Sequence, residues 1–504
     1  MELSRIIKKN SIALIILILF LGLGLRVYWA CQKEGLHCDD VASFAIAECD
    51  GAFPNPNVYV DPHMISSGQE IKRFHYIHDP SLKGALHDIK YMWHRTYDDN
   101  HTNFYYSILR ISFVGMDTTD LSAIIKRATL LNLLFFVISY IFFFKLLMLY
   151  WRDSSVLVFT TLACFAFMVG GVDDTLFYRP YELQMATVMG FAYWLSKIQI
   201  ALAAGTWRFS FRTFSITTIS LTLMLWTGYL MNVLACVFGV FLLWKFYRRG
   251  QLIRGAFFFV GTYICALMLC WLLYQSFFVA LHGDDRVTSK FFTDGVAMRI
   301  WEYVVYWFKL IIHKSLYLYV LGAVLLIAIF SKKPVKHFPP VIIPALVYTV
   351  VAMQISPYDT NRYIVAVTPL LLLVLPMVLE CVINPAYQRV IAVYIILAYM
   401  IMPMFESNFD YLFKRNPTID LLADRTCNIH IVQDKRWKSF FLVAYLEDDI
   451  VYELSDDIKK CDIRQGDLLL NDAELPDAYE HLKLAYLGSY QKHYFYRVKS
   501  VDID

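Results

Sequence analysis

The chain has 504 residues, of which 58% are hydrophobic and 18% are charged, and its formal net charge is +3. A soluble globular protein cannot be this apolar and still cover its surface with polar groups, so we predict a polytopic membrane protein. The small net charge, without a basic run that alternates with aromatic residues, argues against a nucleic-acid partner.

The first apolar segment covers residues 11–30 and follows three cations, Arg5, Lys8 and Lys9. About 20 residues are needed to cross a bilayer core, so this segment is long enough to span it. No cleavage site of small residues follows, and we therefore expect a retained anchor rather than a signal peptide. The preceding cations predict a cytoplasmic N-terminus.

Hydropathy predicts further spans along the chain, about eleven in all. The predicted spans cover residues 11–30, 128–149, 155–171, 181–198, 214–229, 231–246, 256–274, 315–330, 339–354, 363–380 and 388–404. Alternate loops are basic, which predicts that they face the cytoplasm. These loops hold Arg152, Lys197, Arg208, Arg212, Lys245, Arg248, Arg249, Arg254, Lys332, Lys333, Lys336 and Arg389. We expect a multi-pass protein of a bacterial inner membrane.

The opposite, periplasmic loops hold most of the unusual polar clusters, at residues 39–40, 97–106, 171–182, 281–290 and 356–363. Polarity on one side is typical of an active site that opens to the outer face. A transporter would instead carry ionisable residues near the middle of the membrane, usually with an internal repeat. The sequence shows no such repeat.

Two domains are predicted. Residues 1–404 form a transmembrane domain, whose first outer loop, 31–127, contains interfacial helices such as the amphipathic stretch 104–116. Residues 405–504 form a small outer α/β domain. Within it we expect strands at 427–433 and 493–499 and helices at 436–448 and 477–487.

Five cysteines lie outside the predicted spans, where disulfides are permitted. Cys427 and Cys461 could join the two halves of the tail domain. Pairing among Cys31, Cys38 and Cys49 is open, because one of the three must be left over. Reduced cysteines that act as small apolar side chains are the alternative.

Asp39 and Asp40 form a carboxylate pair just after the first span. At the outer lipid-water boundary, one Asp could accept the proton of an acceptor hydroxyl during transfer of a lipid-linked sugar. Crowding of the two carboxylates would raise the pKa of one of them and favour the base role. The alternative is that one of the pair caps the following helix.

Five stretches occur in an order that resembles the GT-C glycosyltransferases. They are CDDVASFAIA, HTNFYYSILRISF, KRATLLNLLFFVISY, FYRPYELQMATVMGFAYWLS and NRYIVAVTPLLLLVLP. Within that group the order is similar to the branch of protein O-mannosyltransferases and lipid A aminoarabinose transferases. The resemblance covers roughly residues 1–400 and implies an α-helical GT-C fold with about eleven transmembrane helices.

The resemblance also assigns site residues near the N-terminus. Asp39 takes the position of the family's catalytic Asp, and Asp40 stands where the family has Glu. His101 matches the histidine of the helix motif, although Thr102 and Asn103 replace its two prolines.

Basic residues match the family's phosphate-binding positions. Lys126 and Arg127 correspond to the start of its second span, Arg179 with Tyr181 to its Arg-x-Tyr, and Arg362 with Tyr363 to its late Arg-Tyr. Arginine suits a bidentate grip on phosphate, so we expect these cations to hold the donor phosphate. Snorkelling to lipid headgroups is the alternative for Lys126 and Arg127.

Two acidic clusters complete the candidate site. Phe177 replaces an acidic residue of the family, and Asp173 and Asp174 could substitute for it. No cofactor is expected, although a divalent metal at Asp39 and Asp174 is an open alternative. His282 and Asp284 lie in the outer loop after the seventh span and could bind substrate; a solvated loop explains them equally well.

The combined expectation is an inverting glycosyltransferase. It would move one sugar from a polyprenyl-phosphate-linked donor to a periplasmic acceptor, which could be O-antigen, lipid A, another cell-envelope glycan or a protein. Asp39 would act as base, and Arg127, Arg179 and Arg362 would stabilise the leaving phosphate. Two other functions remain open: a flippase or transporter of lipid-linked sugars, and an oligosaccharide polymerase or ligase.

Overall fold

The computed structural model describes a defined part of the chain. Side chains are described from residue 12 on, except at 48, 73, 353, 355 and 361. The described residues are 2–48, 63–73, 79–94, 102–116, 120–278, 301, 334–355, 361–382, 384–405, 409–433, 438, 440–491 and 493–501. The candidate residues His101, His282 and Asp284, and also Cys49, lie outside them.

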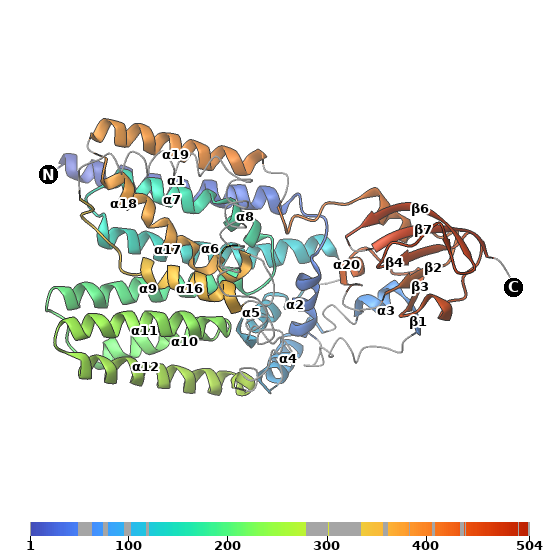
Figure 1. Ribbon diagram of the computed structural model, residues 1–504, viewed down its shortest axis with the longest axis horizontal. Helices are drawn as coiled ribbons and strands as arrows, with labels where there is room; N and C mark the ends of the chain where they lie inside the picture. Colours follow the sequence, from blue (N-terminus) through green and yellow to red (C-terminus); the bar gives the residue numbers. More distant parts are fainter. Residues whose placement is uncertain are drawn as a thin grey trace.

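Helices form a bundle at one end of the molecule and a β-sheet forms the other end (Figure 1). Among the described residues, five helices have spans that are long and apolar enough to cross a membrane. They are α1 (Glu2–Ala30), α6 (Leu121–Tyr150), α11 (Leu230–Arg248), α12 (Leu252–Leu273) and α19 (Pro385–Phe405). The pair α7 (Ser155–Phe167) and α8 (Val169–Thr175), bent by 45°, would make a sixth. The chain is therefore a multi-pass membrane protein.

Helices α9 (Tyr181–Ala203), α10 (Phe211–Leu225) and α16 (Ile342–Ile355) account for three more of the predicted spans. Helix α9 carries the polar side chains Glu182, Gln184 and Gln199, which are buried within the bundle. The predicted span 315–330 lies outside the described residues, so the total of about eleven stays a prediction.

The predicted span at 363–380 forms one short apolar helical stretch, Val365–Glu380, which is interrupted along its length. Residues 361–380 are divided into the short turns η3 (Asn361–Tyr363) and η4 (Val365–Val367) and the helices α17 (Thr368–Leu372) and α18 (Val374–Glu380). The break after α17 has a cause in the sequence, because the ring of Pro376 would clash with the carbonyl of Leu372 in a continuous helix. The segment that starts with Arg362 is therefore irregular backbone.

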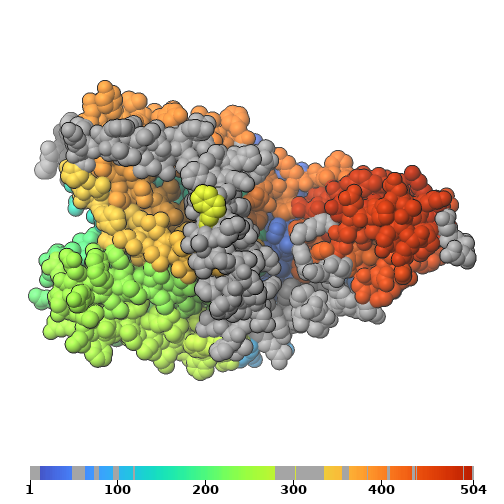
Figure 2. Space-filling model, in the orientation of Figure 1, coloured from blue at the N-terminus to red at the C-terminus, as the bar shows by residue number. Residues whose placement is uncertain are grey.

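A seven-stranded sheet forms the tail domain, in the order β1-β3-β2-β4-β7-β6-β5. Its strands are β1 (His63–Ser67), β2 (Ile429–Val432), β3 (Val451–Ser455), β4 (Leu468–Asn471), β5 (Ala478–Tyr479), β6 (Leu482–Tyr490) and β7 (His493–Val501). Strands β3, β2 and β4 are parallel and the other pairings are antiparallel. Every residue of β2 and β4 is buried, as expected for strands covered on both faces. Figure 2 shows this domain as a separate lobe beyond the bundle.

Strand β1 comes from the first outer loop and pairs with β3 of the tail. The first loop and the C-terminal residues therefore build one sheet, which the predicted boundary at residue 404 did not include. The short helix α3 (Gly68–Arg73) follows β1, and the turns η5 (Pro417–Ala423) and η7 (Ile458–Lys460) lie within the tail.

The two helices predicted in the tail are mostly wrong. Within 436–448 the described helix is α20 (Phe440–Val443), and turns follow it up to the acidic pair Asp448 and Asp449. Residues 477–487 form β5 and most of β6, because Leu482 and Leu484 are buried on alternate positions with exposed Lys483 between them. This period of two is that of a strand.

The predicted disulfide between Cys427 and Cys461 is also wrong, since both cysteines are free. Cys427 precedes β2, and Cys461 follows β3. Because β2 and β3 are parallel, the two cysteines lie at opposite ends of that strand pair. Cys31 and Cys38 are free as well.

Three helices of the first loop lie between the bundle and the sheet: α2 (Cys38–Glu48), α4 (Leu82–His94) and α5 (Asn103–Ser112) (Figure 1). One apolar core runs through this junction and includes Phe44 of α2, Leu109 of α5, Ile125 of α6 and Phe441 of α20. The core fixes the tail domain against the end of the bundle where α2 begins. A position of α5 at the membrane interface stays a prediction.

Candidate active site

The Asp pair lies in the first turn of α2, which begins just after His37. The backbone N–H of Asp39 donates to His37 Nδ1 at 3.0 Å, and the N–H of His37 donates to Asp40 Oδ2 at 2.9 Å. This exchange resembles a capping box, in which the residue before the helix and the third helical residue satisfy each other's backbone. Asp40 thus has the capping contact that was the alternative to catalysis.

Asp40 is fully buried and its oxygens are occupied. Lys33 Nζ lies 3.1 Å from Asp40 Oδ2, and the N–H of Tyr178 donates to Asp40 Oδ1 at 2.7 Å. The same ammonium donates to the carbonyls of Leu176 at 2.9 Å and Tyr411 at 2.8 Å. Burial lowers the pKa of Lys33, and the attraction of Asp40 opposes that shift. Lys33 and Asp40 therefore join α1, α2 and the tail around one buried ion pair.

Asp39 faces a different partner. Its side chain is 29% exposed, and its Oδ2 lies 2.6 Å from Arg362 Nη1. Arg362 also donates from Nη2 to the hydroxyl of Tyr363 at 3.3 Å. Tyr181 and Tyr411 lie close enough to interact with the guanidinium charge. The irregular segment after α16 thus brings a cation to the start of α2.

Aromatic side chains from distant segments enclose the Asp39 region. The ring of Phe177 stacks on Tyr411 at 3.7 Å between centroids and on Tyr181 at 5.7 Å. The imidazole of His37 makes edge contacts with Phe177 and Tyr411. Burial lowers the pKa of His37, so the ring is neutral at pH 7. The site therefore consists of the Asp39 carboxylate and the Arg362 guanidinium, surrounded largely by aromatic side chains.

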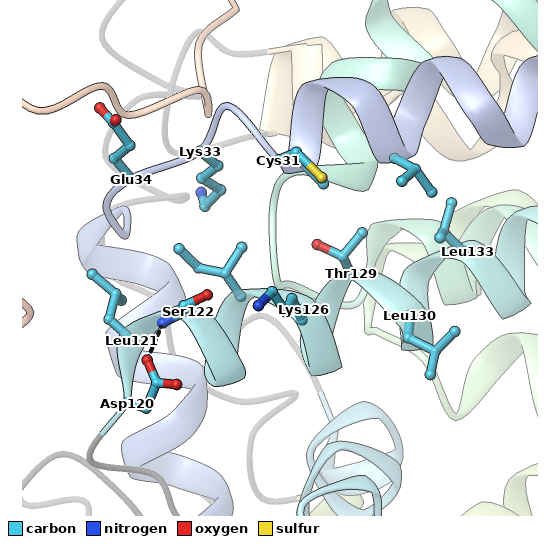
Figure 3. Close-up of a pocket in the computed structure, with 13 residues that line it drawn as sticks. Cys31, Lys33, Glu34, Asp120, Leu121, Ser122, Lys126, Thr129, Leu130 and Leu133 are labelled. Carbon is cyan, nitrogen blue, oxygen red and sulfur yellow. Dashed lines mark hydrogen bonds between the residues drawn. The ribbon is translucent and has the colours of Figure 1, made fainter.

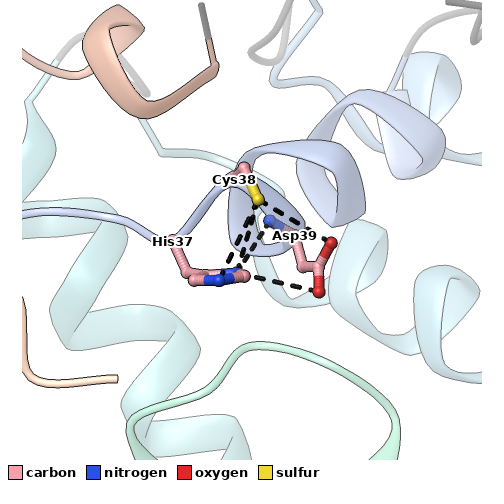
Figure 4. A group of neighbouring side chains, drawn as sticks. All are labelled: His37, Cys38 and Asp39. Atoms are coloured by element: carbon pink, nitrogen blue, oxygen red, sulfur yellow. Dashed lines mark hydrogen bonds and ion pairs between the residues drawn. The ribbon is translucent and has the colours of Figure 1, made fainter. Parts of the chain in front are cut away.

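His37, Cys38 and Asp39 offer metal-ligand atoms within 4.8 Å of one another (Figure 4). These residues fit a metal ion poorly. His37 Nδ1 already accepts the N–H of Asp39, and burial raises the pKa of the Cys38 thiol, which disfavours the thiolate that binds metals. Asp174, the other candidate metal ligand, is not part of this group.

Asp173 and Asp174 point to different parts of the fold. The Asp173 carboxylate accepts the backbone N–H groups of Asp410 at 3.2 Å and Tyr411 at 3.0 Å, so it holds the segment that leads into the tail domain. Asp174 is 3% exposed and interacts with the buried charges of Glu182 and Arg26 inside the bundle.

Arg179 is 7% exposed and lies beside α2. Its Nη1 donates to Ser43 Oγ at 3.3 Å, and Ser43 itself donates to the carbonyl of Asp39 at 2.9 Å. Arg179 is therefore about one helical turn from Asp39. The structure brings Asp39, Arg179, Tyr181, Arg362 and Tyr363 to one region.

Lys126 and Arg127 are exposed on α6. Lys126 lines a cavity of about 730 Å³ between α1 and α6. Figure 3 shows Asp120 and Ser122 at one end of its lining and Leu130 and Leu133 at the other. The lining changes along α6 from these polar residues to Leu130 and Leu133. Lys33 also lines it, but its ammonium is engaged with Asp40.

Sequence reasoning missed three residues of this site: Lys33, His37 and Tyr411. A lysine between the first span and the Asp pair was a visible signal for Lys33, because a buried carboxylate needs a cationic partner. Tyr411 had no signal, since only the folded chain brings residue 411 beside residues 33 and 177.

No protein-family model matches the sequence, and no curated protein matches it. Among solved structures, the fold is similar to a crystal structure of ArnT from Cupriavidus metallidurans bound to undecaprenyl phosphate. The TM-score is 0.51 at 11% sequence identity, and the match covers 95% of this chain and 97% of that one. At this identity the likeness shows the fold alone. The chain therefore shares the overall fold of that structure, in agreement with the GT-C fold that its ordered motifs predicted.

Proposed function

We propose that the chain is a membrane glycosyltransferase that moves one sugar from a polyprenyl-phosphate-linked donor to an acceptor at the end of the bundle that carries the tail domain. The single observation behind this is the partly exposed Asp39 carboxylate held 2.6 Å from Arg362. It combines a base with a cation suited to phosphate. The undecaprenyl phosphate of the ArnT structure supports a lipid of that class as partner.

In this mechanism Asp39 accepts the proton of the acceptor hydroxyl. The oxygen then attacks the anomeric carbon, the bond from that carbon to the phosphate oxygen breaks, and polyprenyl phosphate leaves as an anion. A single in-line displacement inverts the anomeric centre. The leaving phosphate is already a stable anion, so stabilisation of its charge matters more than protonation.

Arg362 has two tasks in this scheme. Its guanidinium keeps Asp39 ionised before the donor binds, because a nearby opposite charge favours the carboxylate. The guanidinium carries five N–H donors, so it can hold a phosphate oxygen without leaving Asp39. Arg179, one turn along α2, supplies a second positive charge to the same region.

Asp40 and Lys33 have a positioning role. Their ion pair is inaccessible, with 0% exposure of both side chains, and it fixes the first turn of α2. The Asp40 carboxylate thereby holds the backbone from which Asp39 projects. We assign the catalytic base to Asp39 alone.

The cavity between α1 and α6 suits part of an amphipathic lipid. Its polar end near Ser122 and Lys126 could accept a headgroup, and its inner wall of Leu130 and Leu133 could contact an isoprenoid chain. Lys126 would then bind the lipid anion, whereas snorkelling remains the alternative role for Arg127.

The test is a transfer assay with the purified chain in detergent, a panel of short-chain polyprenyl-phosphate sugars and a cell-envelope extract. The wild type should consume one donor, and Asp39→Asn should not, although its melting temperature stays unchanged. A matched control is Asp420→Asn, which removes an exposed carboxylate of the tail domain. Donor transport without a new glycosidic bond would support the flippase, and long products would support the polymerase or ligase; either result would refute single-sugar transfer.

A further inference from the structure

A second cavity lies at the opposite end of the bundle from the tail domain, near the end where α1 begins (Figure 1). Its volume is about 560 Å³. It forms where α6, α9 and α11 end, and Phe338 and Pro340 before α16 close one side. This end also carries basic loops that the sequence analysis identified but the proposed transfer reaction does not use.

Three cations from the end of α11 line this cavity: Lys245, Arg248 and Arg249. No acidic residue is among the described residues that line it. In the part of the chain that the structure describes, none of the three pairs with a carboxylate: Lys245 and Arg248 lie over the ring of Trp244, and Arg249 donates to the carbonyl of Ala203. Three uncompensated like charges at one cavity repel one another, so a bound anion would stabilise the arrangement.

Gln199 provides an independent sign of a ligand. Its side chain lines the cavity and is only 4% exposed, yet neither its amide oxygen nor its amide nitrogen has a hydrogen-bond partner. A buried amide without partners is unfavourable, and each such group in a folded protein calls for an explanation. A ligand that offers both an acceptor and a donor would satisfy it.

The surroundings place this ligand at the level of lipid headgroups. Trp244 is 46% exposed and lines the cavity, and Tyr247 on the same turn is 65% exposed. Exposed Trp and Tyr at the end of an apolar helix mark the interface between membrane and water. The apolar surface of α11 continues from here, with Val240 exposed for acyl chains to contact.

We propose that this cavity binds the headgroup of an anionic glycerophospholipid. Lys245 and Arg248 hold the phosphate, the Gln199 amide donates to a phosphate oxygen, and its carbonyl accepts from a glycerol hydroxyl. Basic pockets between transmembrane helices are a known mode of anionic lipid binding. The inference does not depend on the proposed transferase activity, because the cavity lies at the other end of the bundle from Asp39.

The experiment is a titration of the purified full chain with phosphatidylglycerol, followed by native mass spectrometry and by thermal unfolding. The double variant Lys245→Gln/Arg248→Gln should bind this lipid at least about tenfold more weakly, since each cation near a headgroup contributes to affinity. The matched control is Arg208→Gln/Arg212→Gln. It removes two exposed cations, one in the loop between α9 and α10 and one in the first turn of α10, and it should bind the lipid as the wild type does.

A second variant keeps the test decisive if the double variant is unstable. Gln199→Leu should bind phosphatidylglycerol more weakly, yet melt at the same or a higher temperature without lipid, because it removes the unpaired amide. Equal binding by the variant and control pairs would overturn the proposal. So would equal binding of phosphatidylcholine, or an equal thermal shift with inorganic phosphate alone, which would identify a free anion as the ligand.

Discussion

Removal of the Asp40 charge should destabilise the fold far more than removal of the Asp39 charge. In Asp40→Asn the single amide oxygen can accept from only one of the N–H groups of His37 and Tyr178, and Lys33 keeps its ammonium in a fully buried place. Loss of one partner of a buried ion pair costs about 3–5 kcal/mol. Lys33 can instead become neutral by losing its proton. Deprotonation of a lysine with a pKa of 10.5 costs about 5 kcal/mol at pH 7, and this cost is the upper limit of the destabilisation.

A double-mutant cycle measures this directly. Thermal and chemical unfolding of the purified chain in one detergent should rank Asp40→Asn as the least stable single variant, and Lys33→Met/Asp40→Asn as more stable than Asp40→Asn alone. Lys33→Met should cost less than Asp40→Asn, because the Asp40 carboxylate keeps two backbone donors.

The pH dependence gives this prediction a definite sign. In Asp40→Asn the folded pKa of Lys33 falls further below its unfolded value of 10.5, so the stability it contributes is present at high pH and is lost as pH falls. The deficit of Asp40→Asn relative to the wild type should therefore shrink as pH rises from the Lys33 pKa of the folded variant to that of the folded wild type, by at most about 1.4 kcal/mol per pH unit. Equal stability of Asp40→Asn and wild type, or no recovery in the double variant, would refute the reasoning.

Three further predictions concern other parts of the molecule. Arg362→Lys should retain more transfer activity than Arg362→Met, yet lose the bidentate grip on phosphate and raise the KM for the donor; equal kinetics would argue against phosphate binding there. Asp173→Ala should increase protease cleavage between residues 405 and 415, because two backbone N–H groups lose their acceptor, with Asp410→Ala as a side-chain control. Burial lowers the pKa of His493 to about 4, so the tail domain should lose about 3 kcal/mol as pH falls from 6.5 to 4, and His493→Phe should remove that slope in hydrogen-exchange measurements.

Much of the helical bundle could be predicted, because membrane spans depend on local apolar content. Long spans such as α1, α6 and α12 coincide with the hydropathy peaks. The interruption within 363–380 was not predicted, because an apolar average hides the effect of Pro376 on the backbone. The prediction of helices in the tail domain was wrong for another reason. Residues 477–487 have a helical composition, but pairing with β7 and burial of Leu482 and Leu484 favour a strand.

The candidate site could be predicted only where its residues belonged to a recognisable motif. Asp39, Arg179 and Arg362 were found in this way, and the structure brings them to one region. The contacts of Asp173 with the backbone at residues 410 and 411 could not be predicted, since they join segments more than 200 residues apart. Local sequence does not distinguish an acidic side chain that accepts hydrogen bonds from a distant backbone segment from one that binds a metal.

Helix geometry explains why the carboxylates of Asp39 and Asp40 have different partners. Successive residues of an α-helix point about 100° apart, so two adjacent carboxylates in a first turn leave the helix in different directions. One of them reaches back toward the residue before the helix and is drawn into the capping contact, as Asp40 is. The other projects to the side, where Arg362 meets Asp39. In this chain Asp40 therefore has the structural contacts, and the proposed role as base falls to Asp39.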